Sequence, residues 1–94
     1  MKRVEVSRLV GDFVRQQAPD SRKALRAALK KLEKEQGDIR ALDGPLKSYW
    51  RLRVRTYRVI FAMEDGVIRC LFAERRSVVY QVFEQMLKHS LLGK

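Results

Sequence analysis

The chain has 94 residues, a length that fits one domain and leaves no room for two. Hydrophobic residues make up 46%, too many for a disordered tail, and the one cysteine and one histidine argue against a disulfide framework or a zinc site. The 21 Lys and Arg outnumber the 11 Asp and Glu, and the net charge of +10 favours a polyanionic partner: nucleic acid, an acidic protein or an anionic membrane surface.

Membrane insertion and export are not expected. No apolar run approaches the roughly 18 residues that a bilayer requires. Glu5 and Asp12 interrupt any signal-like segment after the basic start. We therefore expect a complete cytoplasmic chain in which residues 1–94 form a single domain without a membrane partner.

The chain begins with a predicted strand and helix. Residues 4–6 alternate between apolar and polar, which is typical of a short strand. Ser7 is placed to cap the next helix by accepting a backbone N–H. Pro19 ends that helix, because the residue before a proline is pushed out of the helical conformation.

A second helix follows directly, with Asp20 or Ser21 expected as its cap. Its apolar residues recur at helical spacing and form one stripe: Ala24, Leu25, Ala28, Leu29 and Leu32. Gly37 suits the left-handed residue that ends a helix. Two helices joined by so short a link should form an antiparallel hairpin.

After a loop predicted over residues 39–47, the period changes to two. Trp50, Leu52 and Val54 face one side of a strand, and Arg51, Arg53 and Arg55 face the other. The chain turns at Arg55–Thr56 into a strand over residues 57–63, which brings Arg58 to the arginine side.

The last part of the chain predicts a hairpin and a helix. Asp65-Gly66 suits a type I′ turn, which leads into a strand over residues 67–72. Ser77 is expected to cap the final helix. The order β-αα-βββ-α predicts an α+β fold: a small antiparallel sheet, an N-terminal helical hairpin and a C-terminal helix. The first strand should join the sheet at or near an edge.

One segment carries positive charge alone. From Gly44 to Met63 there is no Asp or Glu and there are five basic residues: Lys47, Arg51, Arg53, Arg55 and Arg58. Alternate strand residues lie about 7 Å apart, close to the spacing of phosphates along a nucleic-acid strand. Arginine holds phosphate bidentately. We predict that Lys47, Arg51, Arg53 and Arg55 bind nucleic-acid phosphates; Lys30 and Lys31 either also contact nucleic acid or form a solvated helix face.

Two segments resemble a known family. Residues 49–61, with the sequence YWRLRVRTYRVIF, and residues 73–80, with the sequence AERRSVVY, resemble the RelE/ParE superfamily of bacterial toxins from type II toxin–antitoxin pairs. Leu42-Asp43-Gly44 matches the Leu-x-Gly loop that precedes them in that superfamily. The likeness covers about half the chain, residues 41–83, and the predicted element order agrees with it.

The resemblance implies an activity and partners. RelE-like members are ribonucleases that cleave messenger RNA in the ribosomal A site and inhibit translation. They use no metal or other cofactor: the 2′-hydroxyl attacks the adjacent phosphate, giving a cyclic phosphate and a free 5′-hydroxyl. The implied partners are the ribosome with its mRNA and an acidic antitoxin with a segment that folds around the toxin. Operator DNA is reached only through the antitoxin.

The resemblance also implies the catalytic positions: Arg51, Arg53, Arg58, Arg75, Arg76 and Tyr80. Active RelE-like members carry Lys at one or both strand positions where this chain has Arg51 and Arg53. Arginine is a poor general base, because its pKa exceeds about 12. Glu74 is the only nearby carboxylate; we interpret it as structural, with a catalytic role as the alternative.

Two alternatives remain open. ParE-like toxins share the fold and inhibit DNA gyrase without cutting RNA, and a basic module could bind an antitoxin or RNA without any catalysis. ParE-like toxins generally lack the full basic-plus-tyrosine set, so Arg51, Arg53, Arg58 and Tyr80 favour the RelE-like branch.

Overall fold

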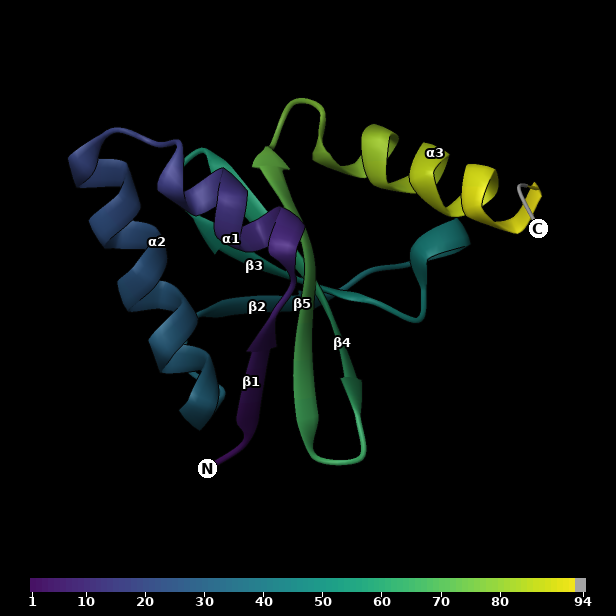
Figure 1. Ribbon diagram of the computed structural model, residues 1–94. Helices are drawn as coiled ribbons and strands as arrows, with labels where there is room; N and C mark the ends of the chain where they lie inside the picture. The colour runs from purple at the N-terminus through teal and green to yellow at the C-terminus, as the bar shows by residue number, and fades with distance from the viewer. Residues whose placement is uncertain (93–94) are drawn as a thin grey trace.

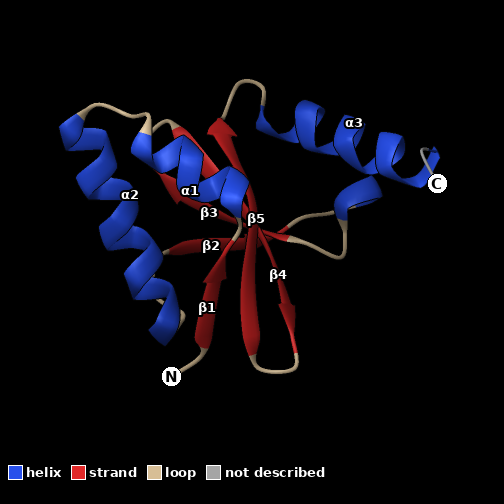
Figure 2. Cartoon of the chain, viewed as in Figure 1, coloured by secondary structure: helices blue, strands red, loops and turns tan. Residues whose placement is uncertain are grey.

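The structure is a computed structural model that describes the backbone of residues 1–92 and the side chains of residues 1–90. It has the predicted α+β class (Figures 1 and 2). The helices and strands of the described part are β1 (Arg3–Val6), α1 (Arg8–Arg15), α2 (Pro19–Lys31), β2 (Asp38–Ala41), β3 (Trp50–Val54), β4 (Tyr57–Glu64), β5 (Val67–Arg75) and α3 (Val79–Leu92), with short 3₁₀ helices η1 (Leu32–Lys34) and η2 (Gly44–Leu46).

The strands form one sheet in the order β1-β5-β4-β3-β2. β3, β4 and β5 are an antiparallel meander, and β1 pairs with β5 in parallel at the edge, where the sequence placed it. Asp65 and Gly66 have φ values of 52° and 77°, the positive values that a type I′ turn requires.

The first face of the sheet is covered by α1 and α2 (Figure 1). The predicted alternation is confirmed: Leu52 and Val54 of β3 point into this core, as do Val59 and Phe61 of β4. α2 and η1 contribute Leu25 and Leu32, both buried at predicted apolar positions, and α1 contributes the buried Val10 and Val14. This layer contains most of the buried apolar surface, so it is the main source of stability.

The second face of the sheet is covered only in part. α3 and η2 pack on it through a smaller cluster made of Leu46, Ile60, Val79 and Phe83. Figure 2 shows α3 on the opposite side of the sheet from α1 and α2. Charged side chains occupy the rest of this face toward the β3–β4 turn.

The helix starts confirm one prediction and correct two. Ser7 Oγ accepts the Val10 N–H at 3.2 Å and caps α1, as expected. α2 begins at Pro19 after an extended Ala18, so neither Asp20 nor Ser21 is its cap. Proline suits the first helical position because its φ is preset and its missing N–H would have no helical partner there. α3 begins at Val79, two residues beyond the cap expected at Ser77.

The predicted loop over residues 39–47 is wrong at its start. β2 (Asp38–Ala41) pairs antiparallel with β3 and forms the second edge of the sheet. Its sequence, Asp-Ile-Arg-Ala, alternates polar and apolar residues over only four positions, and Ile39 alone of the four packs against the core. Pairing with β3 makes it a strand.

The end of the helical hairpin also differs from the prediction. α2 continues into η1, and Glu35 rather than Gly37 takes the left-handed conformation that ends it, with φ of 54°. Gly37 is needed for another reason: its φ is 127°, and a Cβ built there would lie 2.9 Å from Leu52 Cδ1.

We expect Glu35→Gly to raise the free energy of unfolding by about 0.5–1 kcal/mol, because glycine removes the left-handed strain of a side-chain-bearing residue. Gly37→Ala should lower it by about 1–3 kcal/mol, because the added methyl must displace Leu52 in the core. Urea denaturation of the two variants beside wild type measures both. Equal midpoints for all three proteins would contradict this account of the hairpin end.

Candidate functional site

A row of four charged residues crosses the open part of the second face. The register pairs Asp38 with Arg53, Arg53 with Arg58, and Arg58 with Glu74, on β2, β3, β4 and β5 in turn. Directly opposed residues of antiparallel strands have Cβ atoms about 4.5–5.5 Å apart. The sheet therefore brings two arginines and two carboxylates into one line.

Arg58 is the buried member of this row, with an exposed fraction of 7%. Its Nη1 donates to the carbonyl oxygens of Arg55 at 3.0 Å and Tyr57 at 2.8 Å. Within residues 1–90, no carboxylate comes within 4.0 Å of its guanidinium. A buried charge with only neutral partners is poorly compensated, so an arriving anion would supply the missing countercharge.

Arg51 lies on the predicted face, but its charge is already paired. Its Nη1 is 3.0 Å from the Asp38 carbonyl oxygen and 3.1 Å from Asp38 Oδ1, and its side chain is 12% exposed. Arg53 differs, because its side chain is 53% exposed and lies 4.0 Å from Asp38 Oδ2. Of the two strand arginines, Arg53 is the one available to a phosphate.

Two exposed arginines lie in or beside the β3–β4 turn. Arg55 lies in the turn itself with φ of 57°, and the backbone N–H of Arg76 donates to the Thr56 carbonyl oxygen at 2.8 Å. We call Arg53, Arg55, Arg58 and Arg76 the arginine cluster. Its four charges come from β3, the turn, β4 and the segment after β5, all at one end of the sheet.

The structure turns Arg75 to the opposite face from Arg58 and keeps Tyr80 on the Arg58 face of the sheet. Arg75 pairs with Tyr57, whose ring faces the helical layer and packs edge-on against Phe13. Strand alternation therefore directs Arg75 to the opposite face from Arg58. Tyr80, in the first turn of α3, is half-buried against the cluster that contains Ile60, the next residue of β4 on the Arg58 face.

The predicted lysines lie outside the arginine cluster. Lys47 is exposed just after η2, before β3 begins. Lys30 and Lys31 are exposed in the last turn of α2, in the helical layer on the other side of the sheet. They line a hollow of about 450 Å³ together with Lys34 and Glu33. Their role in RNA binding stays a prediction.

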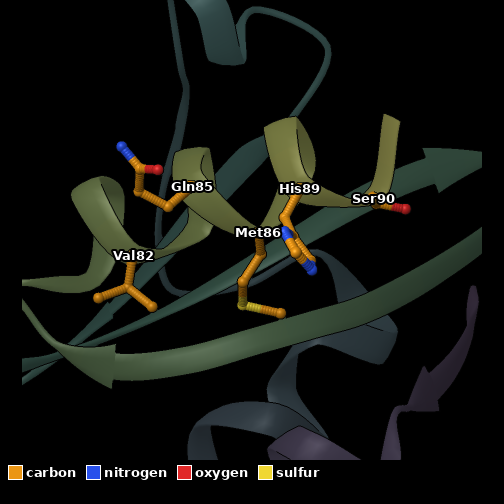
Figure 3. Close-up of a pocket in the computed structure, with 5 residues that line it drawn as sticks. All are labelled: Val82, Gln85, Met86, His89 and Ser90. Carbon is orange, nitrogen blue, oxygen red and sulfur yellow. The ribbon is translucent and has the colours of Figure 1, made fainter. Parts of the chain in front are cut away.

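A shallow hollow of about 520 Å³ on α3 is separate from these charges. Figure 3 shows Val82, Met86 and His89 pointing to the same side of the helix. No member of the arginine cluster lines it. His89 is exposed and lines this hollow, which contains no residue of the charged row.

Neither a metal site nor a membrane-spanning helix is found in the part of the chain that the structure describes. It contains no group of three His, Cys, Asp or Glu side chains placed to hold a metal ion. None of its helices is long and apolar enough to cross a membrane.

Comparison with known proteins supports the fold. The chain is similar to the archaeal RelE–RelB complex from Pyrococcus horikoshii (TM-score 0.65, 24% identity, 80% of this chain and 94% of that chain). It is also similar to YafQ from E. coli, with a TM-score of 0.65 and 14% identity over 83% of this chain and 97% of that chain. The toxin–antitoxin complex RelBE2 from Mycobacterium tuberculosis is similar as well, with a TM-score of 0.62 and 15% identity over 80% of this chain and 98% of that chain. No protein-family model and no curated protein matches the chain. The resemblance seen in the sequence is thus confirmed for the fold, which is that of RelE-like toxins.

The one cysteine, Cys70, lies in the apolar core and is 1% exposed. Burial raises the pKa of its thiol to about 12, so the thiol stays protonated and does not act as a nucleophile at neutral pH.

Stability should therefore fall as the pH rises above about 9. Below that pH the thiol is protonated whether the chain is folded or unfolded; above it only the unfolded chain ionises, which lowers the free energy of unfolding by about 1 kcal/mol at pH 10. Urea denaturation at pH 8 and pH 10 measures this loss. Cys70→Ala should show a smaller difference between the two pH values, and an identical difference would contradict the assignment.

Proposed function

We propose that this protein is a cytoplasmic RelE-like toxin, an endoribonuclease that cleaves mRNA on the ribosome and so inhibits translation. The observation that carries the proposal is Arg58, a buried guanidinium without a carboxylate partner among the described residues, at the centre of an arginine cluster. The fold of RelE-like structures supports the same reading.

In this proposal the cluster provides the positive charge that the reaction needs. Arg53 and Arg58 hold the non-bridging oxygens of the scissile phosphate and stabilise the charge that develops on them in the transition state. The exposed Arg55 and Arg76 hold neighbouring phosphates. Tyr80 gives a proton to the leaving 5′-oxygen. No metal is required for any of these roles.

The remaining basic residues would have supporting roles. Lys47 and Arg51 extend the phosphate-binding face, with Arg51 limited by its pairing with Asp38. Lys30 and Lys31 contact ribosomal RNA from the helical layer. Arg75 is not given a catalytic role, because the register turns it to the other face.

The proposed protein partner is an acidic antitoxin. A net charge of +10 speeds the encounter with an acidic chain by electrostatic steering. RelE–RelB and the RelBE2 toxin–antitoxin complex have this fold, which supports a partner of that kind. The antitoxin would bring the complex to operator DNA.

The decisive variant is Arg58→Met, which removes the charge and keeps most of the side-chain volume. We expect single-turnover cleavage of mRNA on programmed ribosomes to slow by at least about 100-fold, since a preorganised donor to the transition state is lost. The free energy of unfolding should change by less than about 1 kcal/mol, because an apolar side chain replaces an unpaired buried charge.

Primer extension maps the new mRNA ends for both proteins. Cleavage by Arg58→Met at the wild-type rate would contradict the site. Intact mRNA with folded wild-type protein would contradict the ribonuclease and favour gyrase inhibition, which a DNA supercoiling assay measures.

Arg53→Ala should weaken RNA binding about tenfold at low salt, because it removes one exposed phosphate contact. The slope of log affinity against log salt should become less steep by about 0.7. Fluorescence anisotropy with 2′-O-methyl RNA, which is not cleaved, measures both quantities.

Arg8→Ala is the matched control, because it removes the same charge from a 94% exposed side chain on α1. An equal loss of RNA affinity in Arg8→Ala and Arg53→Ala would show that binding depends only on net charge and not on the position of Arg53.

A further inference from the structure

Phosphodiester cleavage by the 2′-hydroxyl needs a group that accepts its proton, and the arginine cluster does not provide one. A guanidinium does not give up its proton at neutral pH, so it cannot accept another. The one histidine of the chain, His89, lies on the α3 hollow, away from the cluster. The acceptor must therefore be sought among the carboxylates of the charged row.

The row contains two carboxylates in different situations. Asp38 is engaged: its Oδ1 lies 3.1 Å from Arg51 Nη1 and its Oδ2 lies 4.0 Å from Arg53 Nη1. Glu74 forms no ion pair within residues 1–90. Its Oε2 accepts the backbone N–H of Arg75 at 2.8 Å, a bond that fixes the carboxylate and leaves Oε1 to accept a proton.

The sheet holds Glu74 beside the group that would bind the phosphate. β5 continues to Arg75, beyond the predicted end at residue 72, so Glu74 lies within the strand and is the direct cross-strand partner of Arg58. It is half-buried on the same face as Arg58. When Arg58 binds the scissile phosphate, the 2′-hydroxyl of the adjoining ribose therefore comes to lie beside the Glu74 carboxylate.

We propose that Glu74 is the general base of the cleavage reaction, an assignment that rests on the proposed ribonuclease function. The Glu74 carboxylate takes the proton of the 2′-hydroxyl as that oxygen bonds to phosphorus. The bond from phosphorus to the 5′-oxygen breaks, and the leaving oxygen takes a proton from Tyr80. The products are a 2′,3′-cyclic phosphate and a 5′-hydroxyl, and water returns the proton from Glu74 to Tyr80.

Glu74→Gln tests this role, since it keeps the shape and an acceptor for the Arg75 N–H but cannot take a proton. Single-turnover cleavage on programmed ribosomes should slow by at least about 100-fold. Affinity for mRNA with a 2′-O-methyl group at the scissile position should stay equal or increase. Asp65→Asn, which removes one negative charge at the β4–β5 turn and retains a residue suited to that turn, should cleave at the wild-type rate.

A second variant separates proton transfer from a structural role. Glu74→Ala should regain cleavage when formate is added, and chloride at the same ionic strength should not restore it. The absence of rescue, together with a lowered melting temperature, would overturn the proposal in favour of a structural carboxylate.

Failure of the proposal and failure of the proposed function give different results. Wild-type cleavage with an equally fast Glu74→Gln would overturn the general base alone. No cleavage by folded wild-type protein would overturn the ribonuclease and the general base together.

Discussion

The pairing of β4 with both β3 and β5 is the constraint on which the rest of the structure depends. Residues 57–61 of β4 each have a partner on both sides, so the register of β4 determines which side chains meet across three strands. On one face it aligns the apolar residues that α1 and α2 cover. On the other it aligns Arg53, Arg58 and Glu74. A shift by one residue would exchange the two faces and destroy both the core and the charged row.

Burial of Arg58 lowers the stability of the fold. Burial deprives its guanidinium of water, and only two carbonyl oxygens replace that solvation within the described residues. The large core on the other face, with Phe61 and Leu52 fully buried, can tolerate such a loss. Asp38 shows the opposite arrangement, because it neutralises Arg51 close by. The face thus contains a partly buried arginine, Arg51, whose charge is compensated, and a buried arginine, Arg58, whose charge is not, a difference that favours anion binding at Arg58.

Sequence reasoning succeeded where the pattern is local. The period of two over Trp50–Val54 predicted the strand and its arginine face, and Asp65-Gly66 predicted the turn. It failed where a distant partner decides the conformation: β2 is a strand because β3 pairs with it. Burial of Arg58, engagement of Arg51 by Asp38 and the position of Glu74 depend on cross-strand register, which no local pattern contains. The arginines were therefore predicted as a set, and their different roles were not.

The parallel pairing of β1 with β5 has a consequence for how the protein is made. Arg3 pairs with Val67, and the Ser7 N–H donates to the Cys70 carbonyl oxygen, so the first strand needs a partner from the last third of the chain. Chains emerge from synthesis N-terminus first. A nascent chain that stops before β5 has neither a closed sheet edge nor the neighbour of Arg58. The charged surface can form only after β5 has been synthesised. The ribosome has therefore made most of the chain before the protein can be active.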